Sequence, residues 1–151
     1  MGVTTTPSII SERTINPQPL IAVSDVESSS HWYQTVLGLK SGHGGTDYEQ
    51  LIFNGRMVMQ LHHWDAHHHP YLGNSQSKPY GNGVVLWFQT EKIDKAFKRA
   101  QAQKAEILET IKRNTNANHR EFWLRDPDGY VVVVAGAYGD IGWAPGSGHG
   151  K

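Results

Sequence analysis

The chain has 151 residues, which is enough for one domain with a sizeable core or for two small repeated modules. Its 14 Lys and Arg residues balance its 14 Asp and Glu residues, so its charge favours neither nucleic acid nor an anionic membrane as the main partner. The absence of cysteine excludes disulfides, thiolate nucleophiles and cysteine-based metal sites.

The N-terminal region shows no targeting pattern. Residues 1–14 lack the basic and apolar segments of a signal peptide, and no apolar run approaches the roughly 20 residues that span a bilayer. We therefore expect a cytoplasmic protein in which residues 1–17 form an N-terminal extension.

The first half of the chain predicts a strand, a helix and three further strands. Residues 20–23 are a short apolar strand. Ser24 and Glu27 match a capping box with Ser24 as the N-cap, and Gly38 is a stop signal, so we expect a helix over residues 25–37. Strands are expected next at residues 39–42, 48–53 and 57–63, the last two joined by an Asn54-Gly55 turn typical of hairpins.

The second half repeats this order after a linker at residues 70–81. A strand is expected at residues 83–90, and apolar residues at helical spacing predict a helix from residue 93 to about residue 104. Strands follow at residues 106–111, 120–125 and 130–135, before a Gly-rich and mobile tail at residues 138–151. The shared order indicates a duplication, with α+β modules of βαβββ type at residues 18–69 and 82–137.

Three motifs carry a resemblance to a known family. They are Val-Ser-Asp-Val-Glu-Ser-Ser at residues 23–29, Trp-Tyr-Gln-Thr-Val-Leu-Gly-Leu at residues 32–39, and an Asp-Pro-Asp-Gly-Tyr turn at residues 126–130. In this order they resemble the vicinal oxygen chelate superfamily, which includes glyoxalase I, bleomycin-resistance proteins and extradiol dioxygenases, over residues 18–137. The resemblance implies that the two modules curl into an open barrel around a cavity and that the protein pairs as a homodimer.

The same resemblance implies a metal site with one ligand from each of four strands. In this sequence the matching positions hold Gln18, Gln60, either Val84 or Val85, and Val133. Divalent metals of this class require carboxylate or imidazole donors, and two of the four positions are aliphatic. We therefore expect neither the family metal nor another cofactor.

The resemblance places a ligand pocket inside the barrel. Strand alternation puts Gln60 and His62 on one face, so both are expected to line the cavity. The candidate ligand-binding residues are Gln18, Gln60, His62, Trp87, Tyr130 and His43, with either Glu121 or Phe122 as a further neighbour. The alternative for Trp87 and Tyr130 is packing in the core.

A histidine cluster follows the fourth strand, in His62-His63-Trp-Asp-Ala-His67-His68-His69. His63 and His67 are four residues apart and Asp65 can orient one of them, as in some metal sites. The alternative, which the sequence favours, is a solvated polar loop. The triple serine at residues 28–30 and His31 are expected on the helix surface, with no nucleophile among them.

The sequence supports three functions. The leading hypothesis is a protein like the bleomycin-resistance branch, which binds a small organic molecule without metal. The second is an enzyme of lyase, isomerase or dioxygenase type that uses His62 and Gln60, a non-standard metal site at His67–His69, or metal-free proton transfer by His62 or Glu121. The third is a protein-interaction module whose barrel is filled by its own side chains.

Overall fold

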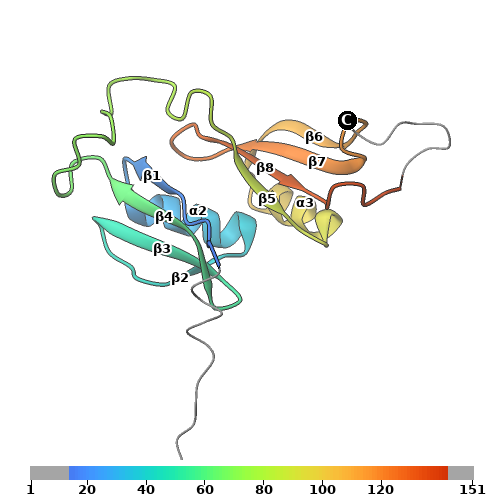
Figure 1. Ribbon diagram of the computed structural model, residues 1–151, viewed down its shortest axis with the longest axis horizontal. Coiled ribbons are helices and arrows are strands. Elements are labelled where there is room, and N and C mark those ends of the chain that lie inside the picture. The colour runs from blue at the N-terminus through green and yellow to red at the C-terminus, as the bar shows by residue number, and fades with distance from the viewer. Residues whose placement is uncertain (1–13, 143–151) are drawn as a thin grey trace, which may run out of the picture.

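The computed structural model describes residues 14–142, which form two four-stranded sheets, one in each half of the chain (Figure 1). The first half contains β1 (Leu20–Val23), α2 (Val26–Leu37), β2 (Lys40–Ser41), β3 (Tyr48–Phe53) and β4 (Arg56–His63). The second half contains β5 (Leu86–Gln89), α3 (Ile93–Ala102), β6 (Glu106–Asn114), β7 (His119–Arg125) and β8 (Val131–Ala135). The prediction of two βαβββ modules is confirmed.

The two sheets have the same topology. Their strand orders are β1-β4-β3-β2 and β5-β8-β7-β6. The β1–β4 and β5–β8 pairs are parallel, and the other pairs are antiparallel. Within residues 14–142 no strand pairing joins one sheet to the other, so the expected closure of the two sheets into a barrel is not shown.

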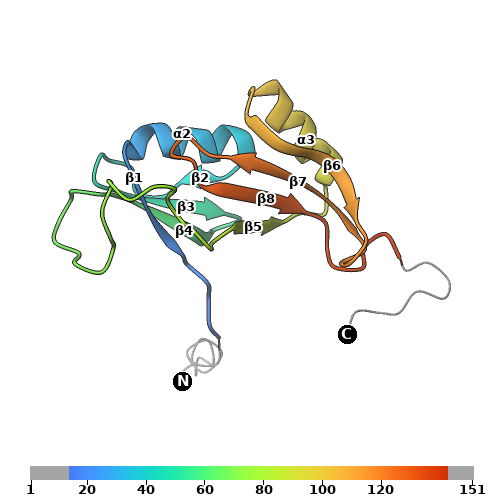
Figure 2. The ribbon, with the colours of Figure 1, turned by 90° about the horizontal axis from the view of Figure 1, so that it is seen from above.

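Both helices lie on the same side of the sheets, as Figure 2 shows. The side chains facing α2 and α3 form the core, which includes Leu51, Met59, Leu61, Phe122, Leu124, Val132 and Val134. Because side chains alternate along a strand, the intervening residues lie on the opposite side of each sheet. These two surfaces, called the open faces below, carry Gln60 and His62 in the first sheet and Trp87, Glu121 and Val133 in the second.

The start of α2 differs from the prediction in two respects. Asp25 is the N-cap instead of Ser24, because its Oδ1 accepts a hydrogen bond from the Ser28 amide at 2.9 Å. Ser28 is exposed, but Ser29 and Ser30 are buried, contrary to the expected surface position of all three. Serine is small enough to lie between helix and sheet, and the Ser30 hydroxyl has a buried partner there in Glu49 (2.7 Å).

Several element ends also differ from the prediction. β5 begins at Leu86 instead of residue 83, because Gly81 and Gly83 adopt positive φ angles in the preceding turn. β6 extends to Asn114 instead of residue 111. Gly139 donates its amide to a carbonyl of the β6–β7 turn at 2.7 Å, so this end of the tail is held. Residues 1–13 of the extension and 143–151 of the tail lie outside the described residues.

The Asp-Pro-Asp-Gly-Tyr turn joins the two modules. Asp126 accepts a hydrogen bond from the Tyr33 hydroxyl of α2, Asp128 accepts two from Ser24, and the Tyr130 hydroxyl donates to the Ala22 carbonyl of β1, all at 2.7 Å. Burial raises the pKa of Asp126, even though three hydrogen bonds to it act in the opposite direction. The motif that carried the family resemblance is therefore the module junction.

Arg99 forms a second connection between the modules. From α3 it donates to the carbonyls of Val36 (2.9 Å) and Leu37 (3.1 Å) in the last turn of α2, which satisfies acceptors that the helix leaves unpaired. Neither helix in the described part of the chain has the length and apolar character needed to cross a membrane.

Candidate functional site

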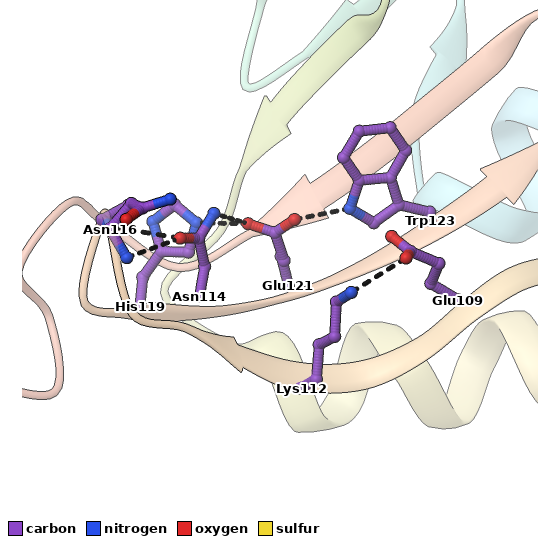
Figure 3. Close-up of polar contacts among 8 residues, drawn as sticks. Glu109, Lys112, Asn114, Asn116, His119, Glu121 and Trp123 are labelled. Atoms are coloured by element: carbon purple, nitrogen blue, oxygen red, sulfur yellow. Dashed lines mark hydrogen bonds and ion pairs between the residues drawn. The ribbon is translucent and has the colours of Figure 1, made fainter.

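A buried carboxylate lies on the open face of the second sheet, near the turn between β6 and β7 (Figure 3). Glu121 in β7 is only 3% exposed and accepts hydrogen bonds from Asn114 Nδ2 (2.7 Å), His119 Nε2 (2.8 Å) and Trp123 Nε1. Burial alone raises the pKa of this group, but the three donors outweigh burial, and the pKa is lowered. Glu121 is therefore a carboxylate anion held by neighbouring side chains.

His119 is oriented by this carboxylate. A carboxylate anion only accepts hydrogen bonds, so we assign the ring proton of His119 to Nε2 and a lone pair to Nδ1. Nδ1 is buried and has no hydrogen-bond partner among the described residues. The arrangement resembles a histidine base that a carboxylate holds in one tautomer, while its second nitrogen has no hydrogen-bond partner within residues 14–142.

Trp87 lies beside this pair on β5. The centroids of the Trp87 and His119 rings are 5.8 Å apart, and the indole is 49% exposed. An exposed indole next to a buried polar group can stack on a planar molecule. This exposure argues against the alternative in which Trp87 is packed in the core.

The open face of the first sheet gathers polar groups around Tyr48 in β3. The Tyr48 hydroxyl donates to Gln60 Oε1 at 2.6 Å, and its ring lies 6.3 Å from the His62 ring and 5.1 Å from the His43 ring. Gln60 Nε2 donates to the backbone carbonyl of Gln18 at 2.8 Å. The sequence predicted Gln60, His62 and His43 for this region, but not Tyr48.

Glu49 holds the loop that carries His43. It lies on the helix-facing side of β3, where its Oε1 accepts the amides of His43 (3.1 Å), Gly44 (2.7 Å) and Gln50 (2.9 Å). Its Oε2 accepts the hydroxyls of Ser30 and Ser41, each at 2.7 Å. Burial raises the pKa, but these donors lower it to about 2. The sequence gave no signal for this role, because the five donors come from three separate segments.

Two other predicted residues lie away from the open faces. Tyr130 is 6% exposed, and its hydroxyl is used by the Ala22 carbonyl, which supports the packing alternative. Phe122 packs against Phe97 of α3 with ring centroids 5.0 Å apart, so Glu121 is the β7 neighbour on the open face.

The four positions that the resemblance assigns to a metal do not fit one. Val133 is fully buried, Val84 and Val85 are 54% and 40% exposed, and none of the three offers a donor atom. The Gln60 amide is already bonded on both its oxygen and its nitrogen, and Gln18 contributes only a second neutral amide. A dication at this place would lack both an anionic and an imidazole ligand.

The histidine cluster places three of its five rings together. One ring nitrogen from each of His62, His67 and His69 lies within 4.8 Å of the others, while His63 and His68 are outside this group. His62 is buried at the end of β4, and the other two are exposed in the following loop. The sequence contained the residues, but the positive φ of His67 that turns the loop back was not predictable from it.

A cavity of about 370 Å³ lies between the modules and is lined by both apolar and charged residues, among them Leu39, Phe53, Phe88 and Arg99. None of the residues predicted to bind a ligand lines it. The cavity is therefore separate from the predicted ligand-binding residues, of which Gln60, His62 and Trp87 lie on the open faces.

Comparison with known proteins agrees with this architecture. Residues 16–134 match the profile of the family described as Glyoxalase/Bleomycin resistance protein/Dioxygenase superfamily. No curated protein matches the sequence.

Solved structures with a similar fold have low sequence identity. An integron cassette protein from the mobile metagenome of V. cholerae is 24% identical, with a TM-score of 0.62 over 82% of this chain and 94% of that chain. Lactoylglutathione lyase from Agrobacterium tumefaciens is 17% identical, with a TM-score of 0.61 over 82% and 93%. TioX from Micromonospora sp. ML1 is 15% identical, with a TM-score of 0.63 over 82% and 99%. At these identities the likeness concerns the fold alone.

Proposed function

Since the chain belongs to the glyoxalase/bleomycin resistance protein/dioxygenase superfamily, we propose that it binds a small organic molecule at its open faces, without a metal at the four family positions. The observation that carries the proposal is the replacement of metal donors by Val85 and Val133 beside an exposed Trp87. Apolar surface with a few oriented polar groups is the usual composition of a small-molecule site.

The side chains on the open faces favour a planar molecule with a polar edge. Trp87 offers an exposed aromatic surface, and its ring lies beside His119, which is hydrogen-bonded to the anionic Glu121. On the first sheet, Gln60, His62 and His43 offer polar atoms around Tyr48. Gln18 remains a candidate through its exposed side chain, next to Gln60.

The proposal includes a homodimer. Leu20, Val85 and Trp87 are apolar, lie on the open faces, and are each between 39% and 49% exposed. A second copy of the chain would cover this surface and enclose a bound molecule, as clusters of exposed apolar side chains often mark interfaces. Sedimentation velocity of the purified protein tests this part, and a monomer at all concentrations would contradict it.

Binding can be tested by titrating isotope-labelled protein with a library of planar aromatic compounds and recording amide spectra. Hits are expected to shift amides of β4, β5, β7 and β8, and Trp87→Ala is expected to weaken them at least tenfold. Tyr71→Ala is the matched control, since Tyr71 is 98% exposed in the loop between the modules.

A metal-dependent reaction at the family positions would overturn the proposal. Lactoylglutathione is a suitable probe, because a similar structure is a lactoylglutathione lyase. Its turnover, lost with a chelator and retained when His62, His67 and His69 are all replaced by Ala, would show that a metal acts at the family positions after all.

A second candidate function is metal-free proton transfer, which the unpaired Nδ1 of His119 favours. Glu121 orients the ring, and a molecule that reaches the buried Nδ1 would find it without a hydrogen-bond partner from the described residues and able to accept a proton. Turnover by chelator-treated protein that falls at least 100-fold in both His119→Gln and Glu121→Gln would support it. Full turnover in His119→Gln would exclude it.

A further inference from the structure

We propose that His62, His67 and His69 form a binding site for a divalent metal ion of the zinc class, separate from the four positions that the family uses. The three ligating nitrogens lie within 4.8 Å of one another at the end of β4. The site shares His62 with the open face of the first sheet, but metal binding does not require that the open faces bind an organic molecule.

His62 is prepared as a ligand by its hydrogen bond. Its Nδ1 lies 2.8 Å from the backbone carbonyl of His63, and a carbonyl only accepts, so Nδ1 carries the proton. Nε2 therefore presents its lone pair to the loop. Metal-binding histidines almost always have such a partner on the second nitrogen, because it fixes the ring and its tautomer.

The loop after β4 brings the other two rings to this nitrogen. His67 has a φ of 58°, an uncommon conformation for a residue with a side chain, and its Nδ1 lies 3.3 Å from His62 Nε2. Two ligands of a tetrahedral zinc ion, each about 2.0–2.1 Å from the metal, are roughly 3.3–3.4 Å apart. The His62–His67 pair therefore already has the separation that a shared ion requires.

His69 completes the set after a small movement. Its ring centroid is 4.6 Å from that of His62 and 6.2 Å from that of His67. The side chain is exposed in a loop, so rotation toward the ion meets little resistance. Without an ion, His67 Nδ1 can donate its ring proton to His62 Nε2, so metal binding replaces this proton between the two nitrogens.

The donor set selects the type of metal. Three neutral imidazoles suit Zn²⁺, Ni²⁺, Co²⁺ and Cu²⁺, whereas Mg²⁺ and Ca²⁺ require oxygen ligands. Three protein ligands leave one tetrahedral position open, as in zinc sites that bind water or a substrate. A shallow apolar pocket formed by Leu20, Pro70, Tyr71 and Leu72 borders His69, so a molecule on the open position would contact apolar surface.

The test uses the full chain without a histidine tag, freed of metal by a chelator and titrated with Co²⁺. One equivalent is expected to produce the visible absorption bands of four-coordinate cobalt, and Zn²⁺ is expected to displace it. His62→Ala, His67→Ala and His69→Ala are each expected to weaken binding by more than the roughly 10–100-fold that loss of an outer partner causes.

His63→Ala and His68→Ala are the matched controls, since both remove a histidine of the same segment that lies outside the group. Should these two weaken Co²⁺ binding as much as the three ligand variants, the segment would be an unspecific imidazole chelator and the proposal would be wrong. The proposal would also be wrong if no stoichiometric binding occurred. Since His62 is buried, the double variant His67→Ala/His69→Ala decides the outcome if His62→Ala does not fold.

Discussion

At the scale of single residues, two buried carboxylates are charged for the same reason. Glu49 and Glu121 are each 3% exposed, and both have their pKa lowered by several hydrogen-bond donors. A buried charge without such partners costs several kcal/mol, so each carboxylate holds its donor groups firmly in place. Glu49 orders the loop of His43, and Glu121 orders the ring of His119.

Glu49→Gln is expected to destabilise the fold at neutral pH by about 3 kcal/mol, because the pKa of Glu49 falls from 4.5 to about 2 on folding. A lowered pKa contributes stability above the unfolded value, and this contribution is lost as pH falls from about 4.5 toward 2. Urea denaturation at several pH values should show a smaller loss of stability in this range for the variant than for the wild type. Glu106→Gln, whose side chain is 63% exposed, is the control and should retain the wild-type slope.

Glu121→Gln is expected to change the protonation pattern of His119. Without the anion, the ring proton is no longer held on Nε2, and we expect a mixture of the two neutral tautomers together with a loss of about 1–3 kcal/mol in stability. The ¹⁵N shifts of the His119 ring measure the tautomers directly. Unchanged ring shifts in the variant would contradict the orienting role of the carboxylate.

At the scale of elements, the Asp-Pro-Asp-Gly-Tyr turn serves two modules at once. Within its own module it closes the hairpin of β7 and β8, as local turn chemistry predicts. Its side chains reach β1 and α2 of the other module, which local chemistry does not predict. This long-range use also explains why Ser24 is not the helix cap, since its hydroxyl and amide both donate to Asp128.

Asp128→Ala is expected to loosen the contact between this turn and β1. The variant loses both hydrogen bonds from Ser24, and because this carboxylate is near solvent the cost should be about 1 kcal/mol. Hydrogen exchange of the Ser24 amide should accelerate while exchange within α3 is unchanged. Asp94→Ala, which removes an exposed ion pair with Arg120 inside the second module, should leave Ser24 exchange as in the wild type.

At the scale of the whole molecule, the order of elements was predictable and the contacts between modules were not. Apolar periods of two and 3.6 residues and the Gly and Pro signals gave all ten elements to within a few residues. The burial of Ser30 and the His119 partner of Glu121 were missed, and the histidine spacing singled out His63 with His67, whereas the structure groups His62, His67 and His69. Each depends on residues that only tertiary structure brings together.

Arg99→Met is expected to separate the stabilities of the two modules. The guanidinium donates to two carbonyls at the end of α2, so its removal leaves these acceptors unsatisfied and should cost roughly 2 kcal/mol. We expect a lower unfolding midpoint and a broader transition in calorimetry. Lys98→Met, an exposed neighbour on the same helix, is the control, and an equal effect in both variants would exclude the specific role of Arg99.

The parallel pairing of β1 with β4 also sets an order for biosynthesis. Leu20 has its strand partner at Gln60, and Leu86 has its partner at Val132, so neither opening strand of a module acquires its ladder until the closing strand has left the ribosome. The nascent first module can assemble while the second is still being translated. The groups of the first module that bond to the Asp126–Tyr130 turn, in Ala22, Ser24 and Tyr33, then remain bonded to water until almost the entire polypeptide has emerged.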